Sequence, residues 1–152
     1  MDKIYYSYND IHDLCIKLGN KIINEFEPDY ILAISGGGLI PSRIIRKVLK
    51  KPVISVTISY YDSDDQLQSE PKIIQWIDRD IIQNKKILII DEIDDTGRTL
   101  TYLINKLRES NVSELAIGVL HNKIKPKEYN LNNIKYFYGS EIPDKWVVYP
   151  WE

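Results

Sequence analysis

Residues 86–101 read Lys86-Ile-Leu-Ile-Ile-Asp91-Glu92-Ile-Asp94-Asp95-Thr96-Gly97-Arg98-Thr99-Leu-Thr101. A continuous apolar run leads into an acidic pair, and Asp-Thr-Gly-Arg-Thr then opens a segment with helical spacing. This order predicts a buried strand over 87–90, carboxylates at its carboxyl end, and an anion cradle at the start of a helix over 99–108. Few chemistries need all three features so close together.

Segments with helical and with strand character alternate along the rest of the chain. Apolar spacing predicts helices over 11–26 and 39–49, the first capped by Asn9 or Asp10 and ended by Pro28. The alternation predicts a single α/β domain over residues 1–152, with a mainly parallel central sheet flanked by helices. Apolar runs predict the further strands, over 30–34, 53–59 and 115–120. The acidic segment 60–71 is interpreted as a mobile excursion, and the segment 73–77 as an extended return.

The bulk composition narrows the class of protein. The 152 residues are 43% hydrophobic and 28% charged, as in ordinary globular proteins. A net charge of −2 gives no overall positive field for nucleic acid or an anionic membrane, which favours a small phosphorylated ligand bound locally. The single cysteine, Cys15, excludes an internal disulfide and lies at core spacing. Neither a signal-peptide pattern nor a membrane-spanning run is found, which predicts a soluble, cytoplasmic protein.

The segment 91–99 has a direct chemical interpretation. Thr96 to Thr99 would gather backbone amides, two hydroxyls and a guanidinium at a helix start, where the helix dipole favours a phosphate. Asp91 and Glu92 would repel that phosphate, so they should face sugar hydroxyls or a hydrated Mg²⁺. The competing interpretation is that Asp94 or Asp95 merely caps the helix and that the other acids are solvated.

A second candidate anion site follows the first predicted strand of the sheet. Ser35-Gly36-Gly37-Gly38 can bring backbone amides against an anion such as pyrophosphate, or can make a plain tight turn. Ligands of open α/β sheets settle at the carboxyl ends of the strands, where this loop and the acidic pair should both lie. The two histidines, His12 and His121, have no sequence neighbours that suggest catalysis or metal binding.

Three motifs resemble those of a known family. The segment from Ile87 to Thr99 resembles the diphosphoribosyl-binding signature of the type I phosphoribosyltransferases, and 34–41 resembles the pyrophosphate loop of small microbial members. The tail 138–148 resembles the purine-binding end of the hypoxanthine-guanine and xanthine-guanine enzymes. The stretches 75–78 and 120–123 are also similar to that branch. The resemblance implies a type I phosphoribosyltransferase fold, with a small hood from the 60–80 loop and the C-terminal segment.

The resemblance also implies a role for each matching residue. Asp91 and Glu92 would hold the ribose hydroxyls of 5-phosphoribosyl 1-pyrophosphate (PRPP), directly or through Mg²⁺. Asp95 would be the catalytic residue, managing the proton on the purine N7. The residues expected to bind PRPP are Asp91, Glu92, Asp94, Asp95, Thr96, Gly97, Arg98 and Thr99 for the sugar phosphate, and Ser35, Gly36 and Gly37 for the pyrophosphate.

The purine would be held by Lys123 and the C-terminal tail. Lys123 would donate to the purine O6, Trp146 would stack on the base, and the Val147 backbone would meet its edge. From the residues alone, Lys123 could instead be a solvated surface lysine, and Trp146 a packing tryptophan. Glu152 lies near the place of a metal ligand in some relatives. Many relatives carry Arg or Lys where this loop has Gly36.

Together these motifs imply Mg²⁺-dependent transfer of phosphoribose from PRPP to N9 of a 6-oxopurine, in a homodimer or larger homo-oligomer. The sequence leaves open which of hypoxanthine, guanine and xanthine is preferred. Two alternatives stay open: a non-catalytic regulator that binds PRPP or purine nucleotides, and a phosphoribosyltransferase for another base. Lys123 discriminates between the bases, because an ammonium can donate to an exocyclic oxygen but not to an amino group.

Overall fold

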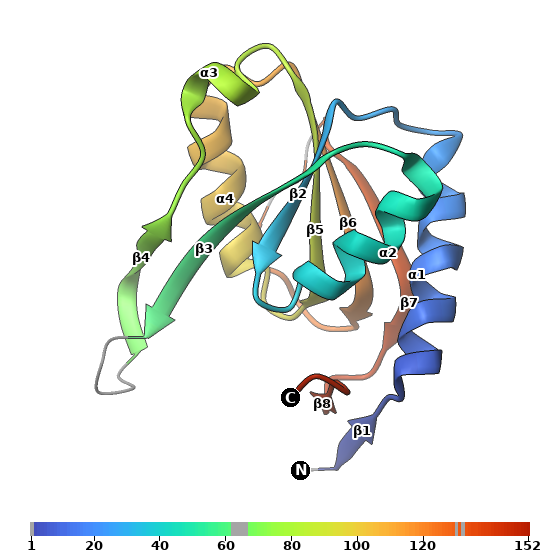
Figure 1. Cartoon of the computed structure of the whole chain (residues 1–152). Helices are drawn as coiled ribbons and strands as arrows, with labels where there is room; N and C mark the ends of the chain where they lie inside the picture. Colours follow the sequence, from blue (N-terminus) through green and yellow to red (C-terminus); the bar gives the residue numbers. More distant parts are fainter. Residues whose placement is uncertain (1, 62–66, 130, 132) are drawn as a thin grey trace.

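A computed structural model describes residues 2–61, 67–129, 131 and 133–152 of the chain. Six strands form one sheet in the order β4-β3-β2-β5-β6-β7 (Figure 1). Neighbouring strands pair in parallel except β4, which is antiparallel to β3 at the edge. The strands of this sheet are β2 (Tyr30–Ser35), β3 (Val53–Tyr61), β4 (Leu67–Gln75), β5 (Lys86–Asp94), β6 (Glu114–Lys123) and β7 (Lys135–Ile142). The predicted mainly parallel α/β sheet is therefore confirmed.

Helices cover both faces of this sheet. The helices α1 (Tyr8–Ile23) and α2 (Leu39–Leu49) pack on one face, and α4 (Arg98–Glu109) with the short α3 (Arg79–Ile82) lies over the other. Along β5, Leu88 and Ile90 join the core under α1 and α2, while Ile87 and Ile89 join the core under α4. Because successive side chains of a strand point to opposite faces, this burial on both faces requires the continuous apolar run seen in the sequence.

Helix α1 begins and ends earlier than the sequence predicted. Its N-cap is Ser7 rather than Asn9 or Asp10: the Ser7 hydroxyl accepts from Asp10 N at 3.1 Å, and the Asp10 carboxylate accepts from Ser7 N at 2.9 Å. The helix ends at Ile23, before Pro28. Cys15 is buried in the core under this helix, and burial raises the pKa of its thiol to about 12, as expected for a packed thiol.

The segment predicted as an excursion over 60–71 belongs in large part to a hairpin. Strand β3 continues through Tyr61 and β4 begins at Leu67, with Tyr61 paired to Leu67. The excursion was therefore placed too broadly, and its centre, 62–66, lies outside the described residues. An antiparallel edge pair tolerates polar residues that a central parallel strand does not, which is why the composition concealed the strand.

A second, two-stranded sheet stands beyond the carboxyl end of the main one. The strand β1 (Lys3–Tyr5) pairs in parallel with β8 (Trp146–Val148), so that Lys3 faces Trp146 and Tyr5 faces Val148. The C-terminal segment of the expected hood is thus joined to an N-terminal strand that the sequence did not predict. Both described ends of the chain lie at this end of the molecule (Figure 1).

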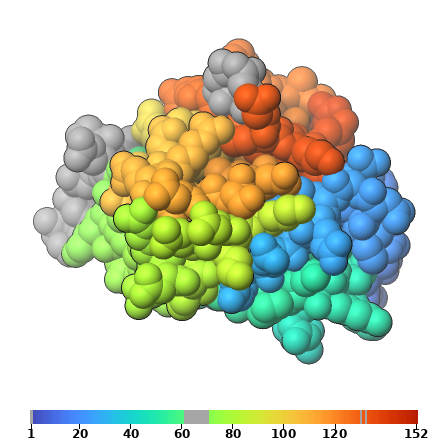
Figure 2. All heavy atoms as spheres, turned by 90° about the horizontal axis from the view of Figure 1, so that it is seen from above, coloured from blue at the N-terminus to red at the C-terminus, as the bar shows by residue number. Residues whose placement is uncertain are grey.

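The opposite end of the molecule is made by segments from many parts of the sequence, which together form a continuous surface in Figure 2.

Within the described part of the chain, no helix has both the length and the apolar character needed to cross a membrane.

Candidate functional site

The end of β5, the glycine loop after β2 and the start of α4 meet at the carboxyl edge of the sheet. A cavity of about 160 Å³ at this edge is lined by ten consecutive residues, Asp91 to Leu100. Strand β5 runs four residues beyond its predicted end, so the acidic residues from Asp91 to Asp94 belong to the strand itself. This places them at fixed positions beside the start of α4.

The start of α4 presents backbone donors without a capping side chain. Its N-cap is Gly97 with a φ of +85°, a left-handed conformation that glycine adopts without strain. No side chain caps the helix, so the interpretation of Asp94 or Asp95 as a helix cap is wrong. The Arg98 side chain points its Nε toward Glu128 Oε2 at 3.4 Å, and the Thr96 hydroxyl accepts from Arg98 N at 3.3 Å. The segment 96–99 thus has the backbone form of an anion cradle.

The acid pair at the end of β5 consists of a buried Asp91 and a half-buried Glu92. Asp91 is buried, and its carboxylate accepts from Glu92 N at 2.9 Å. Burial, and then the charge of Glu92, raises the pKa of Asp91 well above its usual value. Burial also raises the pKa of Glu92, to about 7, against the hydrogen bond with Asp91 and with a further contribution from the charge of Glu152. Neither carboxylate has an ion-pair partner among the described residues.

These surroundings suit a divalent cation whose coordination shell is completed by oxygen atoms of a bound ligand and water. Within the described ranges, no three His, Cys, Asp or Glu side chains converge to form a metal site of protein ligands alone. Mg²⁺ characteristically takes one or two carboxylates together with substrate oxygens and water. The pKa values of Asp91 and Glu92 are raised, and a cation bound beside them would lower both by stabilising the ionised carboxylates. Glu152 is exposed and acts on Glu92 only through its charge.

The glycine loop packs directly against the acid pair. A Cβ at Gly38 would lie 2.4 Å from the Ile90 carbonyl oxygen, so that position does not accept a side chain. A Cβ at Gly37 would lie 0.8 Å from Glu92 Oε2 and would displace the Glu92 carboxylate. Ser35 ends β2 beside them. A Cβ at Gly36 would meet nothing within 4 Å. In the part of the chain that the structure describes, the amides of Gly36 and Gly37 have no hydrogen-bond partner, as a backbone anion site requires.

The side chain of Asp94 faces away from this cradle into a tyrosine clamp. Asp94 is 1% exposed, and its Oδ2 accepts from the hydroxyls of Tyr129 and Tyr136 at 2.6 Å each. Lys127 Nζ lies 3.6 Å from its other carboxylate oxygen and donates to the Asp94 carbonyl at 2.8 Å. The sequence predicted Asp94 among the PRPP-binding residues, but its carboxylate is engaged in holding the end of β5 to β7.

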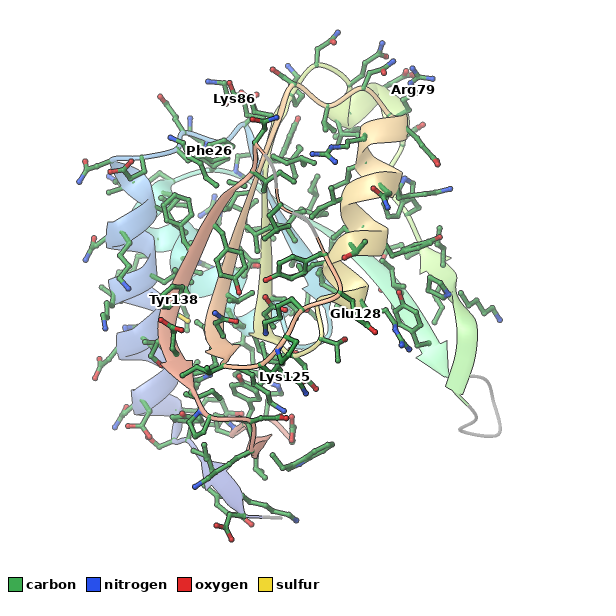
Figure 3. All side chains as sticks on the ribbon, turned by 180° about the vertical axis from the view of Figure 1, so that it is seen from behind. Phe26, Arg79, Lys86, Lys125, Glu128 and Tyr138 are labelled. Carbon is green, nitrogen blue, oxygen red and sulfur yellow. The ribbon has the colours of Figure 1, made fainter. Side chains whose placement is uncertain are left out.

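Asp95 points instead into a cluster of charges. Lys125 Nζ donates to Asp95 Oδ1 at 2.7 Å and lies 3.2 Å from Asp144, while Lys123 Nζ lies 3.6 Å from each of these carboxylates. Burial would raise the pKa of Asp95, but the hydrogen bond from Lys125 and the charges of both lysines outweigh it and hold the pKa below its usual value. Asp95 is therefore an ionised acceptor at neutral pH. In Figure 3, Lys125 and Glu128 lie near the end of the sheet where α4 begins, and Lys86 and Phe26 lie at the other end.

Of the predicted base-binding residues, Lys123 belongs to this charge cluster, and Trp146 and Val147 follow Asp144 closely in the chain. The Lys123 side chain is only 8% exposed, so the interpretation as a solvated surface lysine is wrong. Trp146 is 57% exposed, so it is no packing tryptophan. Val147 is buried in β8, where it pairs with Ile4. Asp144, which contacts both lysines, lies two residues before the start of β8 and ties this small sheet to β6.

An aromatic column behind the acid pair was not predicted. The Tyr149 hydroxyl lies 2.8 Å from His121 Nδ1 and 3.1 Å from the Glu92 carbonyl oxygen. The Tyr149 ring stacks on Trp151 at 4.8 Å, and the Tyr6 ring stacks on His121 at 4.4 Å. The aromatic tail was visible in the sequence, but nothing local indicated that it meets His121, because the partners come from opposite ends of the chain.

Comparison with known proteins agrees with this geometry. Residues 5–152 match the family described as "Phosphoribosyl transferase domain". The chain is 39% identical to the hypoxanthine-guanine phosphoribosyltransferase of Schizosaccharomyces pombe, over 99% of this chain and 89% of that protein. It is 37% identical to xanthine phosphoribosyltransferase 1 of Saccharomyces cerevisiae, over 99% and 90% of the two chains.

Two solved structures have the same fold. A protein of Neisseria gonorrhoeae with bound ppGpp superimposes with a TM-score of 0.90 at 38% identity, over 99% of this chain and 89% of the other. A purine phosphoribosyltransferase of Pyrococcus horikoshii superimposes with a TM-score of 0.81 at 28% identity, over 100% and 95% of the two chains.

Proposed function

The chain belongs to the phosphoribosyltransferase family, and within it to the purine phosphoribosyltransferases, and on that premise we propose that it transfers phosphoribose from PRPP to N9 of a 6-oxopurine. The products are the nucleoside monophosphate and pyrophosphate. The proposed acceptors are hypoxanthine, guanine and xanthine, the bases named in the relatives' activities.

The observation that carries this proposal is the double position of Asp95. Asp95 lines the cavity of about 160 Å³, and its carboxylate pairs with Lys123 and Lys125. Both lysines also contact Asp144, which lies two residues before the exposed Trp146. A site for a phosphorylated sugar and a site for a flat, oxygen-bearing base therefore share one residue. That juxtaposition suits a reaction that joins the two ligands.

On the donor side, the cradle positions the phosphosugar and its leaving group. The amides and hydroxyls of Thr96 to Thr99 would bind the 5′-phosphate, and the free amides of Gly36 and Gly37 would bind the pyrophosphate. Asp91 and Glu92 would orient the ribose hydroxyls and hold Mg²⁺, which when bound would neutralise negative charge on the pyrophosphate. Because Gly36 supplies no cation, these backbone amides take a larger share of pyrophosphate binding than in relatives with Arg or Lys there.

On the acceptor side, the charges select and orient the base. Lys123 would donate to O6, and ionised Asp95 would accept the N7 proton, which directs N9 toward the sugar. Trp146 would cover one face of the base, and the backbone of Val147 would meet its edge. With both reactants fixed, the catalytic contribution of these residues is chiefly alignment and electrostatic stabilisation of a cationic sugar.

A second candidate function is a sensor of guanine nucleotides. The Neisseria gonorrhoeae protein holds ppGpp, which combines a guanine, a ribose and phosphate groups. These are the pieces that the donor and base halves of the present site would bind. A chain that binds PRPP or ppGpp but makes no product would be a non-catalytic regulator.

The decisive experiment presents purified protein with PRPP and Mg²⁺ and measures nucleotide formation from hypoxanthine, guanine, xanthine, adenine and uracil. We expect product from at least one 6-oxopurine and none from adenine or uracil. Product from adenine alone would overturn the assignment of Lys123. Binding of PRPP by calorimetry without product from any base would overturn the enzymatic proposal in favour of the regulator.

The matched control for base selection is Lys127→Met, because Lys127 is held by Asp94 and the backbone rather than by the base-side carboxylates. Lys123→Met should raise the KM for the 6-oxopurine by about tenfold or more, the loss expected when a charged hydrogen bond is removed. Lys127→Met should leave that KM within about twofold.

A homodimer or larger assembly and a cytoplasmic location remain predictions, testable by light scattering and by fractionation.

A further inference from the structure

The hydroxyl of Tyr149 makes two contacts and has one proton to share between them. It lies 3.1 Å from the carbonyl oxygen of Glu92 and 2.8 Å from Nδ1 of His121. A carbonyl oxygen can only accept, so a hydrogen bond to Glu92 uses the Tyr149 proton. The Tyr149 oxygen must then accept from His121, which requires the proton of the neutral imidazole to be on Nδ1.

The alternative arrangement leaves two buried groups unpaired. If Tyr149 donated to His121, its oxygen would face the Glu92 carbonyl oxygen at 3.1 Å with no proton between them. The imidazole proton would then be on Nε2, which is buried and has no partner among the described residues. An orphaned buried N–H is rarer and costlier than an orphaned acceptor. The first arrangement leaves only an unused acceptor at Nε2.

The surroundings of His121 keep it neutral. The side chain is 0% exposed and its ring lies against those of Tyr6 and Tyr149. Burial lowers the pKa of His121 to about 4. The charged residues that line the adjoining cavity of about 440 Å³ are Asp10, Asp13 and Lys17, which are all exposed on α1.

We infer that His121 and Tyr149 form a buried relay, from imidazole Nδ1–H to phenol to the Glu92 carbonyl, that fixes the backbone of the acid pair. Tyr149 is thus a positioning residue, acting through Glu92 on the donor side of the site. This inference rests on the proposed function for its kinetic consequence, but the hydrogen-bond arrangement itself stands independently of turnover.

The relay also connects the acid pair to the segments that follow β1 and β8, near the two ends of the chain. His121 lies in β6, in register with Ile93 of β5, and so is directly beside the strand that carries the acids. Tyr149 follows β8, and its ring stacks almost parallel on Trp151, with an interplanar angle of 5°. Tyr6, which follows β1, stacks on the imidazole. The backbone of Glu92 is therefore held by residues that follow the two strands of the small sheet, one of which, β8, carries Trp146, the proposed base-binding residue.

The first test is the tautomer of His121, read by long-range ¹H–¹⁵N NMR of the imidazoles. The chain has only two histidines, and the resonances are assigned with His12→Gln, a substitution on the exposed face of α1. We expect the uncommon neutral tautomer with Nδ1–H for His121 at neutral pH. In Tyr149→Phe, which keeps the ring but removes the acceptor, the signal should shift toward the Nε2–H tautomer. A wild-type protein with His121 in the Nε2–H form would overturn the relay.

The second test is the binding of PRPP with Mg²⁺, measured by calorimetry and by steady-state kinetics. Tyr149→Phe should weaken PRPP binding and raise its KM by about fivefold, the loss typical of one hydrogen bond. The KM for the base should change less than twofold, because the ring stack is kept. The matched control is Tyr138→Phe, whose hydroxyl donates only to the exposed Glu141 and should change neither constant.

The outcomes separate the relay from the proposed function. If the wild-type protein makes no nucleotide, the transferase proposal fails, whereas the tautomer and the calorimetric loss still support or overturn the relay. An unchanged affinity for PRPP in Tyr149→Phe, or an equal loss in Tyr138→Phe, would overturn the positioning role. If Tyr149→Phe does not fold, the tautomer in the wild-type protein decides alone.

Discussion

Asp94 and Asp95 are adjacent in sequence, yet their carboxylates meet opposite surroundings. Two tyrosine hydroxyls hold Asp94 in the protein interior, whereas two lysines surround a half-exposed Asp95. The difference arises because the strand ends between them and the chain turns toward α4. At this scale Asp94 holds the fold, whereas Asp95 is the residue proposed to contact the ligand.

Removing the Asp94 carboxylate should affect stability first. Asp94→Ala would leave the partly buried hydroxyls of Tyr129 and Tyr136 without their shared acceptor, so we expect the free energy of unfolding to fall by about 1–3 kcal/mol. Urea denaturation measures this loss. Asp13→Ala, on the exposed face of α1, is the control and should change the free energy by less than about 0.5 kcal/mol. Equal stability of the two variants would contradict the clamp.

Removing the charge of Asp95 should affect turnover first. In Asp95→Asn the side chain keeps its shape but no longer accepts the N7 proton as an anion, so we expect kcat to fall by about a hundredfold or more. The KM for PRPP should stay within about threefold, because the cradle holds the donor through other groups. Initial rates at saturating substrates measure both constants. A variant with the wild-type kcat would show that Asp95 has another task.

At the scale of elements, the two anion sites are built in the same way. Both α2 and α4 begin with a glycine at the N-cap and without a capping side chain, so the helix ends stay open to a ligand. Each helix follows a strand of the parallel sheet, and the strands end side by side. In the proposed function the donor would therefore be bound mainly by backbone amides, whose position depends on the packing of the elements.

Gly97→Ala should disturb both the fold and the donor site. A Cβ there would lie 2.0 Å from Tyr129 Cδ1, at a φ of +85° that alanine rarely adopts. We expect a loss of about 1–3 kcal/mol in the free energy of unfolding and a higher KM for PRPP. Denaturation and steady-state rates measure these effects. Gly36→Ala is the steric control, since its Cβ would enter open space, and its free energy of unfolding should match that of the wild-type protein.

Local sequence was enough to predict the elements that form the proposed donor site. The strand from Ile87 to Ile90 and the cradle after it form one continuous segment, so hydrophobic burial and helix-start chemistry were both visible there. The Ser7 cap was also readable, because Ser7 and Asp10 have the spacing of a capping box. The sequence nevertheless favoured Asn9 or Asp10, because they directly precede Ile11, the first apolar residue with helical spacing.

The remaining features depend on contacts between distant residues. Strand β1 has three residues and exists because β8 pairs with it, so no local pattern marks it. The different surroundings of Asp94 and Asp95 depend on Tyr136 and Lys125, which come from other parts of the fold. The same holds for His121, whose partner Tyr149 follows β8. Residue types identified the chemistry, but only the packed structure assigned the partners.

At the scale of the whole molecule, the acid pair links stability to pH. The pKa of Glu92 is raised from 4.5 to about 7 in the folded chain, so its contribution to stability is full below the unfolded pKa and is lost as pH rises through about 7. Asp91 acts in the same direction. We therefore expect the Tm of the ligand-free protein to fall between about pH 5 and pH 8.

Two measurements check this origin by differential scanning fluorimetry. Glu92→Gln should flatten the decline of Tm, because the amide does not ionise. Millimolar Mg²⁺ together with PRPP should raise the Tm most at the alkaline end, where both carboxylates are charged. A decline that is the same in Glu92→Gln would assign the pH dependence to other groups.

The pairing of β1 with β8 joins residues from the two ends of the described chain, whereas the cavity of the proposed donor site is lined by ten consecutive residues. Closing the longer loop costs more conformational entropy, so the small sheet should form late in folding and open first under native conditions. Amide hydrogen exchange should accordingly be faster in Trp146–Val148 than in Lys86–Asp94. A newly made chain would then be able to bind the proposed phosphosugar donor before it could bind the base.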